Sequence, residues 1–286
     1  MTKLAHIINL FQPSENSDLK LAQEVTIASM IRARSEYKNS SKVQLLSAQT
    51  EYDRKVVPTE FVATKNLNRD VSELAHFNGK MQLPILKDIL DRAHEESDAE
   101  YIIYSNVDIG VQPEFYDEVN EIINQGYDAF MINRRRISEK FKSVEELDEM
   151  YSERGKKHPG FDCFVFKREL YPKFSLAEVC IGVPFVEITL SQNLFCFAEK
   201  PKVFEDEHLT FHIGMEIFKE RAPMEYFNYN QVQFWQAMTE IWPKLDSRKW
   251  MKGNWWFPFR IIYWGLHPCF PIRLALQLES RRWRVR

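Results

Sequence analysis

The amino-acid sequence predicts an α/β protein with a mostly parallel central sheet and a C-terminal helical extension. Three observations support this prediction. Strand-like and helix-like patterns alternate from the start of the chain, the run Tyr101–Ser105 is short and apolar, and a basic, aromatic segment follows residue 248. Alternation of this kind is typical of βαβ units, in which a helix connects two parallel strands.

The amino-terminal part contains the first such unit. The apolar run Leu4–Phe11 predicts a buried strand, and Asp18–Tyr37 carries apolar residues at helical spacing. A second strand is expected at Lys42–Leu46 and a short third strand at Phe61–Thr64. Because a helix joins the first two strands, we expect them to be parallel.

The middle of the chain continues this alternation. The segment Asn78-Gly79-Lys80 is expected to open a helix with apolar residues on one side. After it we expect a strand at Tyr101–Ser105, a helix at Phe115–Asn124, a strand at Asp128–Asn133 and a charged surface helix at Ser138–Met150.

The second half of the chain is less regular. The segment Gly155–Gly160 predicts a basic loop, and Phe161–Phe166 predicts the strand that follows it. Glu187 lies between two apolar runs, which indicates either a functional acid or a bend. His208 and His212 are four residues apart, but the residues between them favour a strand over a helical zinc site.

Two polar residues, Asn106 and Asp108, follow the Tyr101–Ser105 strand. In open α/β sheets, ligands bind at the carboxyl ends of the strands. A carboxylate at this edge suits a hard cation such as Mg²⁺ or Mn²⁺, which shares its coordination with phosphate and water. The alternative is that both side chains only cap the following turn, as Asn and Asp often do.

The composition, with 44% hydrophobic and 28% charged residues, is that of a soluble globular protein. A chain of 286 residues suits one large domain, residues 1–248, with an extension, residues 249–286. The four cysteines show no Cys-x-x-Cys spacing, and the first residues lack the pattern of a signal peptide. We therefore expect a cytoplasmic protein without structural zinc.

Residues 249–286 differ in charge from the rest of the chain. They contain eight Lys or Arg residues and one Glu, a net charge of +7, whereas residues 1–248 carry −10. Aromatic side chains alternate with these basic residues, which suits peripheral contact with the inner face of an anionic membrane. The alternative is that the aromatic side chains pack onto the main domain. Nucleic acid is not an expected partner, because the main domain is acidic.

The order of elements resembles the GT-A class of nucleotide-sugar glycosyltransferases over about Lys3 to Gly214. Asn106-Val107-Asp108 falls where this family has its Asp-x-Asp motif, with Asn in place of the first Asp. Asn9 after the first strand, Asp53 after the second, and Lys80 before a helix are placed like the nucleotide and diphosphate contacts of the family. The resemblance implies a Rossmann-like GT-A domain that binds a nucleotide-diphosphate sugar.

The resemblance also implies roles for individual residues. Asn106 would contact the ribose through its amide, and Asp108 with His212 would hold Mn²⁺ or Mg²⁺. Asp162 and Glu187 are the candidates for a general base that acts on an acceptor hydroxyl. The acceptor would be a glycan, a lipid-linked molecule or another hydroxyl compound.

Two alternative functions stay open. A nucleotidyltransferase that makes an activated sugar usually has a glycine-rich phosphate loop after the first strand, whereas Phe11–Asn16 contains no glycine. A non-catalytic relative would instead bind a membrane or a partner through residues 249–286, and Asn106 in the Asp-x-Asp position keeps this alternative open.

Overall fold

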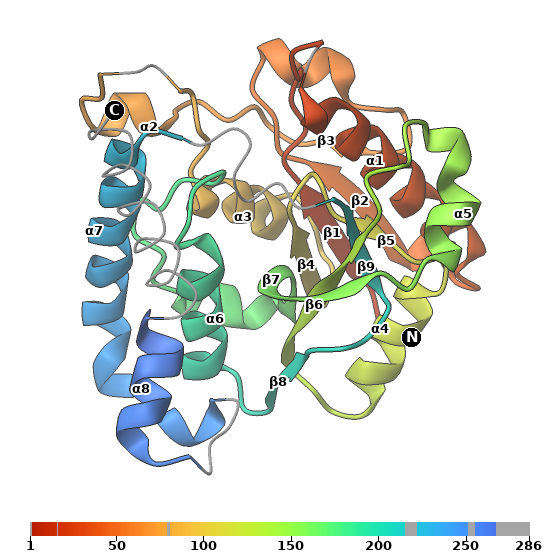
Figure 1. The fold of residues 1–286 in the computed structure, drawn as a ribbon. Helices are drawn as coiled ribbons and strands as arrows, with labels where there is room; N and C mark the ends of the chain where they lie inside the picture. Colours follow the sequence, from red (N-terminus) through yellow and green to blue (C-terminus); the bar gives the residue numbers. More distant parts are fainter. Residues whose placement is uncertain (1, 16, 79–80, 215–221, 251–254, 267–286) are drawn as a thin grey trace.

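A central β-sheet organises the fold, which is seen in a computed structural model that describes residues 2–15, 17–78, 81–214, 222–250 and 255–266 (Figure 1). The strand order is β3-β2-β1-β4-β7-β6-β9-β5, and β8 pairs with β6 beside this path. The strands are β1 (Leu4–Ile8), β2 (Val43–Ser47), β3 (Val62–Ala63), β4 (Tyr101–Ser105), β5 (Gly110–Val111), β6 (Ala129–Ile137), β7 (Lys156–Lys167), β8 (Pro201–Phe204) and β9 (Thr210–Ile213).

Helices cover both faces of this sheet. Figure 1 shows α3, α6 and α7 on one side and α1 and α4 on the other. The helices are α1 (Asp18–Glu36), α2 (Val71–Leu74), α3 (Leu86–Glu95), α4 (Phe115–Asn124), α5 (Leu147–Ser152), α6 (Val186–Phe197), α7 (Met224–Ile241) and α8 (Phe257–Leu266). None of the helices in the described ranges combines the length and the apolar character needed to cross a bilayer.

The predicted parallel unit is confirmed. β1 lies between β2 and β4 and is parallel to both, and β2 is parallel to β3. All five residues of β1 are buried, because its side chains alternate between two cores. Ala5 and Ile7 pack in the core under α3 and α6, whereas Leu4 and Ile8 pack in the core under α1 and α4.

β7 reverses the direction of the sheet at the point where the site forms. It is antiparallel to β4 on one side and to β6 on the other. The middle of β7 therefore lies beside the carboxyl end of β4, with Cys163 opposite Ser105. Residues from two distant parts of the chain meet at this edge.

Two strands are longer than the sequence indicated. β6 runs through the three arginines to Ile137 instead of ending at Asn133, and β7 begins at Lys156. The prediction of a basic loop at Gly155–Gly160 is therefore wrong, because Lys156–Gly160 belong to β7. At this end of β6 and β7 basic residues pair with basic residues, such as Arg136 with Lys156. Such a pattern lacks the apolar alternation by which strands are recognised.

Helix boundaries also differ from the predictions. The helix expected to open at Asn78 begins at Leu86, whose backbone N–H donates to the carbonyl of Val179 at 2.9 Å. The helix expected at Ser138–Met150 is the shorter α5, which follows a turn with a capping box between Ser143 and Glu146. Gly110 belongs to β5, where a side chain would collide with the Phe211 ring.

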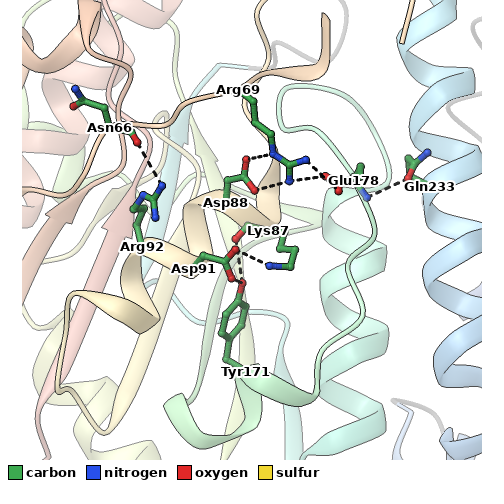
Figure 2. Close-up of polar contacts among 9 residues, drawn as sticks. All are labelled: Asn66, Arg69, Lys87, Asp88, Asp91, Arg92, Tyr171, Glu178 and Gln233. Atoms are coloured by element: carbon green, nitrogen blue, oxygen red, sulfur yellow. Dashed lines mark hydrogen bonds and ion pairs between the residues drawn. The ribbon is translucent and has the colours of Figure 1, made fainter. Parts of the chain in front are cut away.

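A polar network fastens the segment before α6 to the neighbouring helices (Figure 2). The Arg69 guanidinium bonds Asp88 of α3 at 2.8 Å and Glu178 at 2.9 Å. The backbone N–H of Glu178 donates to Gln233 of α7 at 3.1 Å, and the Tyr171 hydroxyl donates to Asp91 at 2.6 Å. The segment that leads into α6 is thus connected to α3 through Arg69 and to α7 through Gln233.

Candidate active site

The predicted site residues gather at the edge where β1, β2 and β4 end. Because these three strands are parallel and adjacent, their carboxyl ends lie on one side of the sheet. Asn9 follows β1, Asp53 lies in a 3₁₀ turn after β2, and Asn106 and Asp108 follow β4. Lys80, the other residue predicted to contact the diphosphate, lies outside the described residues.

Asn9 and Asp53 join the ends of β1 and β2. The Asn9 amide donates to the carbonyl of Ala48 at 2.7 Å. The Asp53 carboxylate accepts from the backbone N–H of Gln12 at 2.8 Å and from the Thr50 hydroxyl at 2.6 Å. These bonds give the predicted nucleotide end of the site a fixed backbone geometry.

Asn106 and Asp108 stand in a tight turn, since the N–H of Ile109 donates to the Asn106 carbonyl at 3.2 Å. Their side chains nevertheless reach other elements. The Asn106 amide donates to Asp162 at 3.3 Å and accepts from the Tyr104 hydroxyl at 3.2 Å. Asn106 thus makes contacts outside the turn as well.

Asp108 and His212 form a close pair, with 3.1 Å between the carboxylate Oδ2 and the imidazole Nε2. His212 lies on β9 and is buried. Burial tends to raise the pKa of Asp108, but the hydrogen bond and charge of His212 and the charge of Arg134 outweigh it and hold that pKa at about 2. Asp108 is thus a carboxylate at any working pH.

The pair fits a divalent cation that takes further ligands from a diphosphate. A carboxylate oxygen and an imidazole nitrogen are ligands that Mn²⁺ accepts. Among the described residues, no cluster of three or more His, Cys, Asp or Glu side chains could hold a metal by itself. A cation at Asp108 and His212 would therefore depend on oxygen atoms of the bound substrate and on water.

Asp162 and Arg134 form a buried ion pair on the adjacent strands β7 and β6, with 2.7 Å between Oδ1 and Nη1. Burial raises the pKa of Asp162 despite the opposing charge of Arg134. The other carboxylate oxygen, Oδ2, and the Arg134 Nε are buried without a partner. Arg134 is therefore a buried, paired residue and not one that is solvated at the edge of the sheet.

Glu187 lies in the first turn of α6. The preceding Phe185 has a φ of 91°, a left-handed conformation that is strained for a bulky side chain. Burial and the charge of Asp162 raise the pKa of Glu187 to about 7. A carboxylate that exchanges a proton near neutral pH has the property required of a general base.

Asn230 of α7 holds the loop that leads to Glu187. Its amide donates to the carbonyls of Cys180 and Pro184 at 2.8 and 3.1 Å, and its oxygen accepts from the Cys180 N–H at 2.9 Å. Asn230 is fully buried. We expect these bonds to help maintain the strained backbone at Phe185.

The structure thus brings together Asn106, Asp108, Asp162, Glu187 and His212, and it places Asn9 and Asp53 along the same edge. Sequence reasoning did not single out Asn230, although its place between Phe227 and Phe234, at the spacing of one apolar helix face, was a usable signal.

Comparisons with known proteins support the fold. No family model and no curated protein sequence matches this chain. Among solved structures, TarS residues 1–349 from S. aureus in complex with UDP matches with a TM-score of 0.52 and 9% identity, over 98% of this chain and 78% of that chain. The same protein in complex with UDP-GlcNAc matches with a TM-score of 0.50 and 10% identity, over 91% and 72%. The expected α/β fold of the glycosyltransferase type is confirmed.

Proposed function

We propose that this protein transfers a sugar from a nucleotide-diphosphate sugar to an acceptor hydroxyl. The observation that carries this proposal is the grouping of Asp108, His212, Asp162 and Glu187 at the carboxyl edge of the sheet. The similar structure of TarS binds UDP and UDP-GlcNAc, which supports a nucleotide sugar as the substrate class. The acceptor is a hydroxyl compound such as a glycan or a lipid-linked molecule.

Asp108 and His212 hold Mn²⁺ or Mg²⁺ in this proposal. When bound, the cation neutralises the charge that develops on the departing diphosphate. Asn106 contacts the ribose through its amide, and Asn9 and Asp53 shape the place of the nucleotide. The hydrogen bond between Asn106 and Asp162 keeps the ribose end and the sugar end of the site in register.

Glu187 is the general base in this proposal, in preference to Asp162. The Oδ1 atom of Asp162 accepts from Arg134 and Asn106, so this carboxylate is fixed to its neighbours in the sheet and serves as part of the binding site. Glu187 has a pKa of about 7, and hydrogen bonds from Asn230 hold the loop that precedes its helix, α6. A base that removes the acceptor proton lets the acceptor oxygen attack the anomeric carbon directly, which inverts the configuration.

The nucleotide site can be tested without knowledge of the acceptor. We expect UDP or GDP to raise the melting temperature of the protein, and we expect Mn²⁺ to increase the shift. Asp108→Ala should remove the increase due to Mn²⁺, because it deletes the carboxylate ligand. Asp246→Ala, which removes an exposed ion pair with Arg248, serves as the matched control. If neither UDP, GDP, CDP nor TDP shifts the melting temperature of the wild type, the proposed function is wrong.

We propose in addition that α8 contacts an anionic membrane surface. Phe259 and Ile262 of α8 are 55% and 56% exposed and lie three residues apart, so they are neighbours on one side of this helix, and Trp256, which precedes the helix, is 72% exposed. A cluster of exposed apolar side chains marks an interaction site more often than single ones do. The net charge of +7 in residues 249–286 favours anionic lipid as the partner over a second protein surface.

Vesicle sedimentation tests this contact. We expect the protein to bind vesicles that contain an anionic phospholipid, to bind phosphatidylcholine vesicles weakly, and to lose binding as salt is added. The double variant Trp256→Ser, Phe259→Ser should bind several-fold less well. Val232→Ser, which changes an exposed apolar residue on α7, is the control. Equal binding by wild type and double variant would contradict a role of α8.

A further inference from the structure

Asn106 and Asp162 are direct neighbours across the boundary between β4 and β7. The two strands are antiparallel, with Ser105 opposite Cys163. The next pair in this register is Asn106 with Asp162, and the backbone N–H of Asn106 donates to the Asp162 carbonyl at 3.3 Å. The pairing therefore continues one residue past the end of β4. Side chains of residues that lie directly opposite each other are close enough to interact.

Two partners of opposite kind orient the Asn106 side chain. Burial raises the pKa of Tyr104 far above its usual value, so the Tyr104 hydroxyl keeps its proton and donates to the Asn106 Oδ1 at 3.2 Å. The Asp162 Oδ1, which accepts from Arg134 at 2.7 Å, also accepts from the Asn106 Nδ2 at 3.3 Å. A carboxylate only accepts hydrogen bonds, so the NH₂ group of the amide has to face Asp162.

An aspartate at position 106 would lack the donor that faces Asp162. It would place a carboxylate oxygen where the amide nitrogen now lies, 3.3 Å from the Asp162 carboxylate. Like charges directly opposite each other destabilise a pair of strands. Asp162 is 4% exposed, so water screens this repulsion only weakly. Burial and the charge of Asp162 also raise the pKa of Glu187 to about 7, which shows that negative charge is already costly here.

Residue 106 also holds the turn that carries Asp108. The Asn106 carbonyl accepts from the N–H of Ile109 at 3.2 Å, which closes the turn around Asp108. The Asn106 backbone N–H is bonded to β7, and its amide is bonded to both β4 and β7. Asp108 in turn lies 3.1 Å from His212 of β9. A displacement of residue 106 would therefore move the Asp108 carboxylate relative to His212.

We propose that positions 106 and 162 share one negative charge, which resides on Asp162 in this protein. Asp162 supplies from the neighbouring strand the charge that the first position of the Asp-x-Asp motif lacks, and Asn106 is the partner that this carboxylate requires. Asp162 and Arg134 act as positioning residues, because they hold the Asn106 amide and through it the turn of Asp108. The asparagine is therefore no sign of a non-catalytic relative. The consequence for Asp108 rests on the proposed function, whereas the shared charge concerns the chain alone.

A double-mutant cycle of stability tests the shared charge. Asn106→Asp places two carboxylates opposite each other, and Asp162→Asn leaves the buried Arg134 without its carboxylate. We expect each variant to melt about 5–10 °C below the wild type. The swap of Asn106→Asp with Asp162→Asn keeps one charge and one amide, and it should melt within about 2 °C of the wild type. Asn228→Asp, at an exposed position of α7, is the control for an added charge and should change the melting temperature by less than about 1 °C.

Nucleotide binding tests the positioning of Asp108. Titration calorimetry of UDP and GDP, with and without Mn²⁺, gives the factor by which Mn²⁺ strengthens binding. We expect Asn106→Asp to reduce this factor about tenfold, because it displaces the turn, and we expect the swap to recover it to within about threefold of the wild type. Asn228→Asp should leave the factor unchanged.

Several results would overturn the inference. An undiminished melting temperature of Asn106→Asp, or a swap that is no more stable than the single variants, would contradict the shared charge. If a single variant does not fold, a folded swap still supports it. A larger Mn²⁺ factor in Asn106→Asp would show that a second carboxylate completes the metal site, and an equal factor in all variants would exclude the positioning role. Failure of the wild type to bind any nucleotide would refute the proposed function, whereas the stability cycle would still decide whether the charge is shared.

Discussion

Glu187→Gln is expected to lower the rate of sugar transfer by about 10²- to 10⁴-fold, the range that a positioned general base contributes. Binding of the nucleotide sugar should stay within about twofold of the wild type, because the amide keeps the size of the side chain. Turnover with a hydroxyl acceptor and titration calorimetry measure the two quantities. Glu169→Gln, an exposed glutamate paired with Lys167, is the matched control.

The pH dependence separates a base from a merely structural acid. The base accepts a proton only in its ionised form, so the wild-type rate should rise with pH through about 7 and then level off. The residual rate of Glu187→Gln should lack this rise. An unchanged profile in the variant, or a product that retains the anomeric configuration, would show that Glu187 is not the base.

Stability provides an independent check on Glu187. Its pKa is raised from 4.5 to about 7 by burial and by the charge of Asp162. Between these pH values the folded protein keeps a proton that the unfolded chain has released, so this residue's contribution to the free energy of unfolding falls as pH rises. At pH 8, Glu187→Gln should therefore melt at or above the temperature of the wild type.

Trp264→Ala is expected to lower the free energy of unfolding by about 3–5 kcal/mol, the usual cost of emptying a buried aromatic site. The Trp264 ring is 1% exposed, stacks on Phe161 at 5.6 Å and contacts Phe195 edge-on at 4.7 Å. The carbonyl of Trp264 also accepts from Gln192 of α6 at 3.0 Å. Urea unfolding measures the loss.

The matched control for this prediction is Trp256→Ala, on the exposed side of the same segment. Because that ring is 72% exposed, its removal should change the free energy of unfolding by less than about 0.5 kcal/mol. Similar effects of the two substitutions would contradict the packing of Trp264 against β7.

The sequence predicted correctly those strands that a local pattern specifies. β1 and β4 are short and buried on both faces, so their apolar runs were enough to locate them. The polar residues that follow them could be assigned to one edge of the sheet, because parallel strands end together. Asp108 and His212 were predicted as a pair, and they lie in contact although 104 residues separate them.

The parts of the fold and of the site that the sequence did not predict depend on contacts between distant parts of the chain. The amino-terminal half of β7 has no apolar alternation, so its strand character follows only from pairing with β6. In the same way, the bonds of Asn230 to Cys180 span 50 residues and follow from the packing of α7, which no local pattern specifies.

The packing of Trp250 and Trp264 determines how the carboxyl-terminal segment can be removed. Both rings belong to the core that also contains Phe161, the immediate neighbour of Asp162. A protein cut after residue 248 would lose this cover from one side of the site, so its inactivity would reveal nothing about membranes. Removal of Trp250 and α8 would therefore disturb this core, and the exposed side of α8 is best studied by changing its outward-facing side chains one or two at a time.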